Sequence, residues 1–389
     1  MSTPEYLSGN KEAIQQFLDK FDVRHSPQTP TLLTPPLYPL TPAPTKKSSP
    51  QVFFRSWVAL GRVGLALVSQ SAIACFRRIS SPNSSLYLPI LTHARFPPTQ
   101  VFLFDCDGVL WSGDHLFPGV PSTLDLLRKK NKQVVFVTNN STKSRQDYKK
   151  KLEGMGIPAT AEEVFGSSYS AAVYISRILP QHHPQLKERN KVFVVGEAGI
   201  ETELDAEGVP HLGGTDPAYR RDVTPEDYKL LAQQDSPALD PDVGVVLFGL
   251  DFHFNYLKLC YAYHYVRRGA LFLATNTDST LPSAGALFPG AGSISAPLVK
   301  MLGGQEPMAF GKPNQAMMDA IEGKFRFDRS KACMVGDRAN TDIRFGLEGK
   351  LGGTLGVLTG VATKEEFLEG DARPHYYVDK LSDLLEGLE

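Results

Sequence analysis

Fold and chemistry are both indicated by the stretch Phe104-Asp105-Cys106-Asp107-Gly108-Val109-Leu110-Trp111. It ends an apolar run, 101–104, that predicts a short buried strand. Strand side chains alternate between faces, so Asp105 and Asp107 point to the same side, while Gly108 lets the backbone turn sharply. One carboxylate can then attack phosphorus while the other handles a proton. Paired acids are also common in turns and structural ion sites, so this stretch alone leaves both interpretations open.

Three further polar segments follow apolar runs in the same way. They are, each with its preceding run, Thr138-Asn139-Asn140-Ser141 after 134–137, Gly311-Lys312-Pro313 after 308–310, and Gly336-Asp337-Arg338-Ala339-Asn340-Thr341-Asp342 after 332–335. In an open parallel sheet, ligands bind beyond the carboxyl ends of the strands, so we expect these segments to converge. The converging groups would be an acid pair, a hydroxyl, a lysine and a second acid pair.

In order and spacing, the four segments resemble the motifs of the haloacid dehalogenase (HAD) superfamily. The resemblance is narrower still to fungal-like members of its 4-nitrophenylphosphatase and phosphoglycolate phosphatase branch. It rests on Asp-Cys-Asp-Gly-Val-Leu-Trp, Val-Thr-Asn-Asn-Ser, Phe-Pro-Gly-Ala-Gly-Ser at 288–293 and Gly-Asp-Arg-x-x-Thr-Asp-Ile at 336–343, and it covers residues 101–389. It implies an α/β fold in which a Rossmann-like core with a parallel sheet carries an inserted α/β cap domain of the C2 type.

The resemblance also suggests a domain plan. We expect an N-terminal helix of the core in 1–22, an insert at 23–100, the first part of the core at 101–180, the cap at 181–306 and the second part of the core at 307–389. Within the cap, the β-branched and apolar stretches 191–195, 243–247 and 271–274 predict strands.

Phosphoryl transfer requires alignment and charge neutralisation more than covalent chemistry, and this requirement explains the residue types. Asp105 is the candidate nucleophile, which would form an aspartyl-phosphate intermediate. Asp107 is the candidate general acid for the leaving group and then the general base for water. Lys312 would offset the charge of Asp105 and of the phosphate.

The resemblance implies Mg²⁺ as the cofactor, a hard cation that prefers oxygen ligands. The expected ligands are Asp105, the backbone carbonyl of Asp107, and Asp337, with Asp342 acting through a bound water.

Phosphate would be held by the hydroxyl of Thr138, the backbone N–H groups of Asn139 and Asn140, and Lys312. Pro313 is expected at the first position of a helix whose positive end points at the same site.

A loop of the cap, at about 277–288, is expected to recognise the leaving group. Leu281 occupies the position where pyridoxal phosphate phosphatase relatives carry a histidine, which favours 2-phosphoglycolate and related phospho-acids. The predicted function is Mg²⁺-dependent hydrolysis of small phosphate monoesters, such as 2-phosphoglycolate and 4-nitrophenyl phosphate. A pyridoxal phosphate phosphatase and an inactive phosphometabolite-binding protein remain as alternatives.

Composition sets the context of this site. The 389 residues are 42% apolar, enough for a sizeable core, and the net charge of −1 argues against a nucleic-acid partner. Four cysteines at unrelated spacings (Cys75, Cys106, Cys260 and Cys333) give no disulfide or zinc pattern, which predicts a reducing, cytoplasmic setting. The resemblance adds a possible homodimer through the cap, with no membrane or nucleic-acid partner.

Residues 23–100 have a different composition from the rest of the chain. They hold no Asp or Glu, eight Lys or Arg, and twelve of the 29 prolines. The segment begins with Val and ends with Gln, whose codons can match the two ends of an intron, so a translated intron is our first hypothesis. Disorder, a misplaced transit peptide and a membrane span at 57–76 are the alternatives, although Arg62 weakens the last. Before the segment, 8–20 predicts a helix with Asn10 as its cap and Ile14, Phe17 and Leu18 on one face.

Overall fold

The computed structural model describes residues 3–21, 100–233, 235–283 and 286–388, and they belong to one compact unit. Of the insert expected at 23–100, only Gln100 is among them, so the intron hypothesis and the stretch 57–76 lie outside the described residues. Within the described part of the chain, no helix has the length and apolar character needed to span a bilayer.

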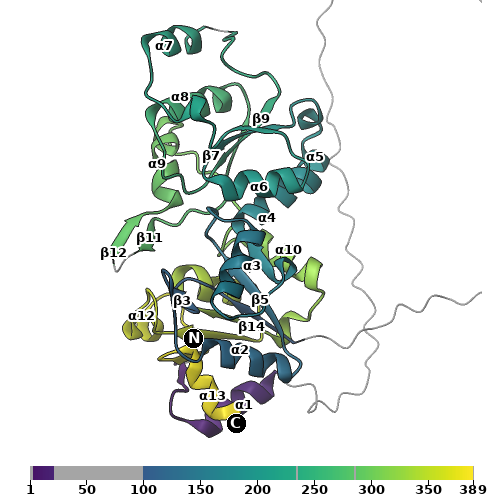
Figure 1. Ribbon diagram of the computed structural model, residues 1–389, viewed down its shortest axis with the longest axis vertical. Coiled ribbons are helices and arrows are strands. Elements are labelled where there is room, and N and C mark those ends of the chain that lie inside the picture. Colours follow the sequence, from purple (N-terminus) through teal and green to yellow (C-terminus); the bar gives the residue numbers. More distant parts are fainter. Residues whose placement is uncertain (1–2, 22–99, 234, 284–285, 389) are drawn as a thin grey trace, which may run out of the picture. The chain divides into compact units, whose positions relative to one another are not determined.

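The core is built on a seven-stranded parallel sheet (Figure 1). Its strands, in spatial order, are β1 Glu5–Tyr6, β16 Tyr376–Val378, β15 Gly353–Val357, β14 Ala332–Gly336, β2 Val101–Phe104, β5 Gln133–Thr138 and β6 Val164–Gly166. All neighbouring pairs are parallel, and Phe104 lies between Phe136 and Val335. The central strands β14, β2 and β5 therefore end at the same edge, and three of the four polar segments begin there.

Both faces of this sheet are buried, which explains why its central strands are apolar throughout. Phe102 and Phe104 pack with helices on one face, and Val101 and Leu103 pack with helices on the other. The core helices are α1 Lys11–Lys20, α2 Val120–Lys129, α3 Arg145–Gly154, α10 Gln315–Phe325, α11 Arg344–Glu348, α12 Lys364–Glu369 and α13 Leu385–Leu388.

Helix α1 confirms the helix expected before the insert, although it begins at Lys11 rather than at Ser8. The N–H of Ala13 donates to Asn10 Oδ1 at 3.0 Å, so Asn10 caps the helix as predicted. Ile14 and Phe17 are buried on its inner face. The ring of Phe17 lies 6.3 Å from that of Phe102, which attaches the helix to strand β2.

A buried lysine joins the two chain ends that flank the undescribed residues 22–99. Lys132 Nζ donates to the carbonyl of Phe21 at 2.8 Å and also to Gln100 Oε1. A buried ammonium group needs such acceptors, because its desolvation is otherwise costly. Phe21 and Gln100 therefore lie on either side of one side chain.

A second parallel sheet forms the cap. Its five strands, in spatial order, are β13 Met308–Ala309, β10 Leu271–Ala274, β9 Val243–Phe248, β7 Lys191–Val195 and β8 His211–Gly213. The strands expected at 191–195, 243–247 and 271–274 are confirmed. The linking and cap helices are α4 Ser167–Val173, α5 Leu179–His182, α6 Ala198–Ala206, α7 Pro225–Leu231, α8 Tyr256–Arg267 and α9 Ala291–Met301. The chain is thus an α/β protein in which a second sheet with its own helices is inserted between the two halves of the core, as predicted.

Two local expectations were wrong. The sequence predicts that the strand before Lys312 lies in the same sheet as the other three, but β13 pairs in parallel with β10 and belongs to the cap's sheet. Pro313 was expected at the first position of a helix, but α10 begins at Gln315 and Asn314 is its cap. The side chain of Asn314 accepts the N–H of Ala316 at 2.9 Å, and this bond moves the helix start two residues beyond the proline.

Two antiparallel hairpins complete the fold. One, β3 Trp111–Ser112 with β4 His115–Leu116, directly follows the first polar segment. The other, β11 Thr280–Ser283 with β12 Ala286–Pro289, extends from the cap (Figure 1). It overlaps the loop at 277–288 from which leaving-group recognition is expected.

Candidate active site

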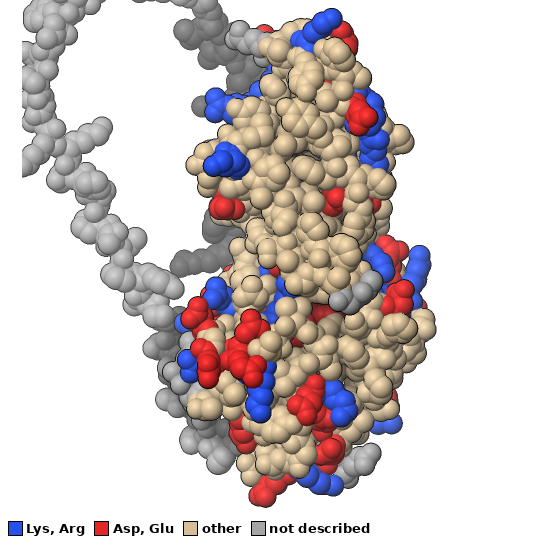
Figure 2. All heavy atoms as spheres, turned by 90° about the vertical axis from the view of Figure 1, so that its left-hand side faces the viewer, with Lys and Arg blue, Asp and Glu red and all other residues tan. Residues whose placement is uncertain are grey.

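The polar segments meet in one pocket between the carboxyl edge of the core sheet and the cap. Its lining consists of Asp105, Asp107, Thr138, Asn139, Asn140, Ser141, Leu250, Asn276, Asp278, Thr280, Leu281, Pro282, Gly290, Ala291, Lys312, Arg338, Thr341 and Asp342. Every site residue expected from the sequence is among them except Asp337. On the face drawn in Figure 2, charged side chains are densest on the core, whereas the cap above it is mostly uncharged.

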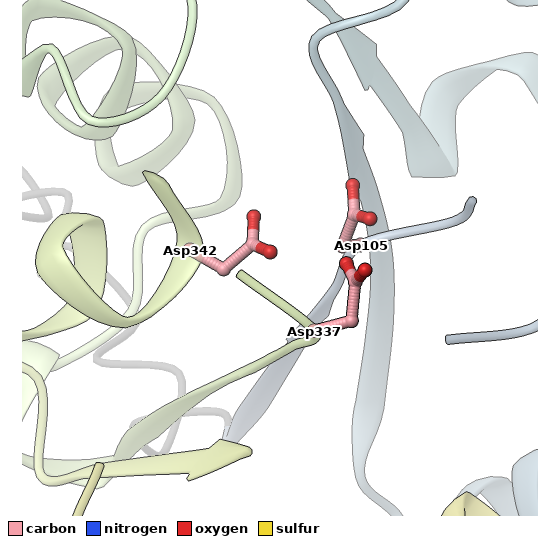
Figure 3. Close-up of side chains that lie close together, drawn as sticks. All are labelled: Asp105, Asp337 and Asp342. Atoms are coloured by element: carbon pink, nitrogen blue, oxygen red, sulfur yellow. The ribbon is translucent and has the colours of Figure 1, made fainter. Parts of the chain in front are cut away.

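Three carboxylates come together at the strand ends (Figure 3). Asp105 follows β2, Asp337 follows β14, and Asp342 lies in the short π-helical turn Ala339–Ile343. One oxygen of each lies within 4.8 Å of an oxygen of each of the others. Asp105 is more than two hundred positions away from Asp337 and Asp342 in the chain, so the parallel sheet is what brings it to them.

Asp337 sits in a cradle that only glycine can line. A Cβ atom on Gly108, which has φ of +90°, or on Gly360 would overlap the Asp337 carboxylate. The N–H of Val361 donates to Asp337 Oδ2 at 2.8 Å and holds this carboxylate in place. Gly108 therefore has a second role beyond the turn that the sequence suggested.

Burial of these acids is energetically costly. It raises the pKa of Asp105 well above its usual range, even though Lys312 lowers it. Burial, with the charge of Asp342, raises the pKa of Asp337 to about 7. The acid cluster therefore favours the nearby binding of positive charge.

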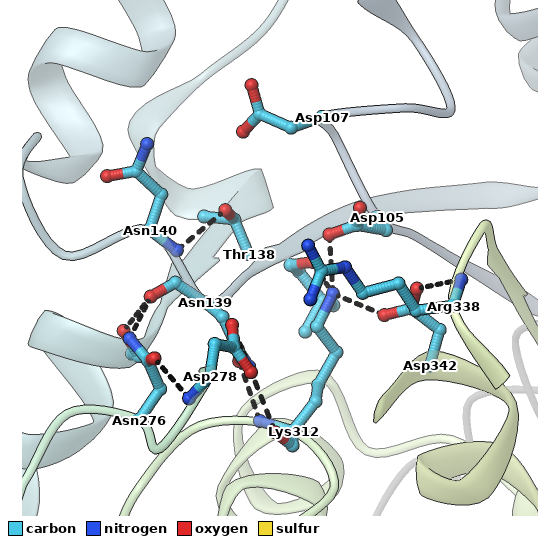
Figure 4. A network of polar contacts seen from close by, with 12 residues as sticks. Asp105, Asp107, Thr138, Asn139, Asn140, Asn276, Asp278, Lys312, Arg338 and Asp342 are labelled. Atoms are coloured by element: carbon cyan, nitrogen blue, oxygen red, sulfur yellow. Dashed lines mark hydrogen bonds and ion pairs between the residues drawn. The ribbon is translucent and has the colours of Figure 1, made fainter. Parts of the chain in front are cut away.

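Lys312 supplies part of that charge. Its Nζ lies 2.5 Å from Asp105 Oδ1 and 2.8 Å from Asp342 Oδ1, and it donates to the carbonyl of Val137 at 2.8 Å (Figure 4). Burial alone would lower the pKa of this lysine, but Asp105 and Asp342 raise it above its ordinary value. Lys312 is therefore a permanent cation, placed where it was expected to offset the charge of Asp105.

Asp342 has a partner on both of its oxygens. Oδ1 pairs with Lys312, and Oδ2 accepts the N–H of Arg338 at 3.0 Å. Its carboxylate is almost fully buried. These contacts fix Asp342 beside the site and leave it less free to bind a metal than Asp337.

Asp107 projects from the strand end separately from the acid cluster (Figure 4). Its Oδ1 accepts the indole N–H of Trp111 at 2.8 Å. Asp107 and Asp105 thus differ in environment, because one is bonded to a neutral donor and the other to a cation.

Thr138 ends strand β5 with its hydroxyl in the pocket. Its Oγ1 lies 3.2 Å from the hydroxyl of Tyr148 and accepts the N–H of Asn140 at 3.1 Å. The backbone N–H of Asn140, expected in a phosphate cradle, is thus directed at Thr138 in this structure. The role of these groups in phosphate binding stays a prediction.

Asn139 acts through its side chain, which the sequence did not indicate. Its Oδ1 accepts the N–H of Lys312 at 2.7 Å, and its Nδ2 donates to the Lys312 carbonyl at 2.9 Å and to Asp278 at 3.1 Å (Figure 4). Its own carbonyl accepts bonds from Asn276 and Ser167, each at 2.7 Å. One asparagine therefore fixes the backbone of Lys312 and connects the core to the segment leading into the cap hairpin.

The cap contributes one wall of the pocket through its hairpin. Leu281 lies on β11 and lines the pocket, and its contact with the leaving group stays a prediction. From the core, Arg338 reaches across and donates to the carbonyl of Thr280 over a long 3.5 Å. The pocket is thus bounded by an apolar side chain of the cap and a cation of the core.

Comparison with known proteins places this geometry in a family. A family model of haloacid dehalogenase-like hydrolases matches residues 102–210, and a second HAD-like hydrolase model matches 309–384. The chain is 51% identical over 290 residues to a 4-nitrophenylphosphatase of Schizosaccharomyces pombe, covering 74% of this chain and 93% of the relative. The chain belongs to the haloacid dehalogenase-like hydrolases.

Further relatives define the branch. Phosphoglycolate phosphatase 1A of Arabidopsis thaliana, a chloroplastic protein, is 44% identical over 74% of this chain and 76% of its own length. A crystal structure of a glycerol phosphate phosphatase from Mycobacterium tuberculosis in complex with magnesium matches with a TM-score of 0.60 and 29% identity, over 74% of this chain and 76% of that one. This haloacid dehalogenase-like hydrolase is therefore a phosphatase of the branch that its motifs predicted.

The acid cluster of this hydrolase fits a magnesium ion. Its donors are hard carboxylate oxygens from Asp105 and Asp337, with Asp342 beside them. The raised pKa values of Asp105 and Asp337 express an excess of buried negative charge that a divalent cation would offset. Asp105 and Asp337 would hold the ion directly.

Sequence reasoning missed two polar residues that line the hydrolase's pocket and one buried tryptophan beside it. Asn276 and Asp278 follow strand β10 and line the pocket, and Trp111 bonds Asp107. The position of Asn276 and Asp278 after an apolar strand was the same signal that identified the other segments, and it could have been used. Trp111 carried no such signal, because its role depends on how the chain folds back on Asp107.

Proposed function

We propose that this hydrolase removes phosphate from small phospho-acids, 2-phosphoglycolate foremost, through an aspartyl-phosphate formed on Asp105. The observation that carries the proposal is the division of labour between the two acids of the first polar segment. Asp105 is held by the cation Lys312, as a nucleophile facing a phosphate requires, whereas Asp107 has a neutral partner and can exchange a proton.

The reaction has two displacements. An oxygen of Asp105 attacks phosphorus and the bond to the ester oxygen breaks, while Asp107 gives its proton to the leaving alkoxide. Asp107 then takes a proton from water as the water oxygen attacks phosphorus, which releases inorganic phosphate and restores Asp105. Mg²⁺, when bound, would neutralise negative charge on the phosphoryl oxygens. Lys312 offsets the charge of Asp105, and the hydroxyl of Thr138 would bond a phosphoryl oxygen.

Arg338 is the observation that favours phospho-acids. Of the two cations that line the pocket, Lys312 is engaged by two carboxylates, whereas the guanidinium of Arg338 pairs with no carboxylate of the described chain. An arginine is suited to binding a carboxylate through two parallel hydrogen bonds. Leu281, which also lines the pocket, offers no polar group to a pyridine ring.

The test is phosphate release with and without Mg²⁺ from 2-phosphoglycolate, glycerol 3-phosphate, 4-nitrophenyl phosphate and pyridoxal phosphate. We expect Mg²⁺-dependent turnover with 2-phosphoglycolate as the best natural ester. Faster release from pyridoxal phosphate would favour that alternative. A folded protein that binds these esters but releases no phosphate would support the inactive binding protein.

Arg338→Gln tests the basis of the substrate preference. Loss of a charge-assisted bond should lower kcat/KM for 2-phosphoglycolate by roughly ten- to a hundredfold. Glycerol 3-phosphate has no carboxylate and serves as the internal control, so its kcat/KM should fall much less. An equal fall on both esters would remove Arg338 from substrate recognition.

A further inference from the structure

The Asp107 carboxylate makes one specific hydrogen bond to a buried side chain. The indole Nε1 of Trp111 donates to Asp107 Oδ1 at 2.8 Å. No other hydrogen bond to the Asp107 carboxylate occurs within the described residues, so Oδ2 has no partner among them. Asp107 itself is part-exposed and lines the pocket, whereas Trp111 is fully buried.

The tryptophan is fixed from several sides, so its N–H has a defined direction. Its ring stacks on Tyr148 with centroids 6.4 Å apart, and Lys151 Nζ lies 4.3 Å from its centroid on a ring face. Lys151 Nζ also donates to the carbonyl of Gly113 at 3.0 Å. The indole is therefore held in place, and the Asp107 carboxylate must orient itself toward the indole N–H.

The backbone between the two residues is closed on itself. The N–H of Gly108 donates to the carbonyl of Trp111 at 2.8 Å, and the N–H of Leu110 donates to the carbonyl of Cys106 at 2.9 Å. Asp107 and Trp111 also form an isolated β-bridge. The carboxylate and the indole thus lie in one tight loop, and the distance between them is set by backbone geometry.

We propose that Trp111 is a positioning residue that determines which oxygen of Asp107 carries the transferable proton. A tryptophan N–H can only donate, so Oδ1 must remain an acceptor. When Asp107 is protonated, the proton therefore lies on Oδ2, which is left free. This inference rests on the proposed role of Asp107 as the general acid.

The chemistry gives a readout that a packing role would not move. An alkoxide leaving group, as in 2-phosphoglycolate or glycerol 3-phosphate, needs a proton when its bond to phosphorus breaks. 4-Nitrophenolate is a stable anion and leaves without one. Loss of proton positioning should therefore slow the first displacement for alkyl esters and have little effect on 4-nitrophenyl phosphate.

The experiment compares kcat/KM for 2-phosphoglycolate, glycerol 3-phosphate and 4-nitrophenyl phosphate in the full chain and in Trp111→Phe. The phenyl ring keeps the stacking partner but lacks the N–H. We expect kcat/KM for both alkyl esters to fall by about tenfold or more, because general acid catalysis contributes on the order of 10² to 10⁴. The value for 4-nitrophenyl phosphate should change by less than about threefold on the same grounds.

Matched variants separate the possible outcomes. Val109→Ala removes buried methyl groups from the same loop and no hydrogen bond, so all three esters should lose activity equally. Asp107→Asn should reproduce the selective loss, and adding Trp111→Phe to it should bring no further selectivity. If Trp111→Phe does not fold, replacement of Trp111 by 3-benzothienylalanine gives the same comparison, because that ring keeps the indole shape without its N–H.

An equal loss on all esters, or no loss on any, would overturn the proposal. Failure of the proposed function is distinguishable, because the unchanged chain would then be inactive on the esters and Asp107→Asn would show no selectivity.

Discussion

Lys312 supplies positive charge to the buried acid cluster. It is buried together with Asp105 and Asp342 and bonds both of them. Its side chain reaches them from a backbone fixed by Asn139, which bonds both the N–H and the carbonyl of Lys312. The site therefore depends on a cation whose position is set by the side-chain amide of Asn139, which is far from it in the sequence.

 The contact joins residues 173 positions apart, so no local pattern could have indicated it.

Asp105→Asn tests the nucleophile. The amide keeps the shape of the carboxylate but cannot attack phosphorus, so turnover should fall on the order of 10⁴-fold or more. The fold should be retained, because the change removes one of three neighbouring buried charges. The measurement is phosphate release together with thermal unfolding of both proteins.

Cys106→Ala is the matched control for that variant. Cys106 adjoins Asp105, but its side chain is buried in the core, and burial raises the pKa of its thiol well above the usual range. An inert thiol of this kind should be replaceable with most of the activity kept. Substantial turnover by Asp105→Asn would refute the nucleophile assignment.

The raised pKa of Asp337 makes metal binding depend on pH. Its pKa of about 7 means that the metal-free carboxyl is protonated below that pH and ionised above it. Because Mg²⁺ binds the carboxylate, its affinity should rise by up to about tenfold per pH unit as the pH approaches 7, and then level off. Titration calorimetry at pH 6 and pH 8 should also detect more proton release at the lower pH.

Asp337→Asn is the control for this dependence. The amide has no proton to lose, so weak binding should persist with a flatter pH profile. Equal Mg²⁺ affinity of the unchanged protein at both pH values would contradict the prediction.

At the scale of elements, the start of cap helix α7 is fixed by one carboxylate. The Asp227 carboxylate accepts hydrogen bonds from both terminal nitrogens of Arg221, each at 2.7 Å, and from the N–H and hydroxyl of Thr224. The bonds from Arg221, together with those from Thr224, hold the pKa of Asp227 well below its usual range. A pKa lowered by folding stabilises the protein above the unfolded value, near 3.9, and this contribution is lost as the pH falls below it.

Asp227→Asn should therefore lower the free energy of unfolding at pH 7 by about 1 to 3 kcal/mol. The difference between the two proteins should shrink as the pH is lowered from about 5 toward 3, because the carboxylate of the unfolded chain then binds a proton while that of the folded protein stays ionised. Urea unfolding followed by circular dichroism measures both effects.

Glu226→Gln provides the comparison on the same helical turn. Glu226 is exposed and lies 3.6 Å from Lys229, a surface pair that contributes little. Its replacement should change stability by less than about 0.5 kcal/mol. A similar effect of both substitutions would show that the bonds of Asp227 do not stabilise the helix start.

At the scale of the whole molecule, core and cap are joined by polar contacts as well as by the chain. Arg145 of α3 bonds Glu203 of α6 through its N–H at 2.7 Å and its Nε at 2.9 Å. Asn139 connects the core to Asp278 at the base of the cap hairpin. These contacts place the hairpin and Leu281 over the strand ends that carry the candidate catalytic acids.

The contacts of Lys132 predict that the segment 23–100 can be removed. Phe21 and Gln100 are bonded by the same ammonium group, so a chain with Asp22 joined to Val101 should close without strain in the core. It loses the Gln100 contact but keeps the bond between Lys132 and Phe21. We expect a melting temperature and a kcat/KM close to those of the full chain, measured by thermal unfolding and phosphate release.

Lys132→Met in the shortened chain is the control for this closure. It should lower stability, because the carbonyl of Phe21 loses its buried donor. A shortened chain that fails to fold, with Lys132 unchanged, would show that residues 23–100 contribute to the core. Sequencing of the spliced message separately tests the intron hypothesis.

Much of the fold and of the candidate site could be predicted from local sequence patterns. Asp105 and Asp337 each follow an apolar strand directly, Thr138 ends another, and parallel strands bring their carboxyl ends to one edge. The helix capped by Asn10 was equally local, because a cap and its N–H partner are three residues apart. Family, fold and reaction class followed from these short segments.

Other features depend on packing between distant segments. Strand β13 joins the cap's sheet because β10 offers it an edge, and its sequence is too short to indicate a partner. The clamp of Asn139 on Lys312, the cradle of Gly360 around Asp337 and the bond of Trp111 to Asp107 all require the chain to fold first. The local sequence determines residue types and short-range order. The orientation of each candidate catalytic group is set by neighbours that only folding brings within hydrogen-bonding distance.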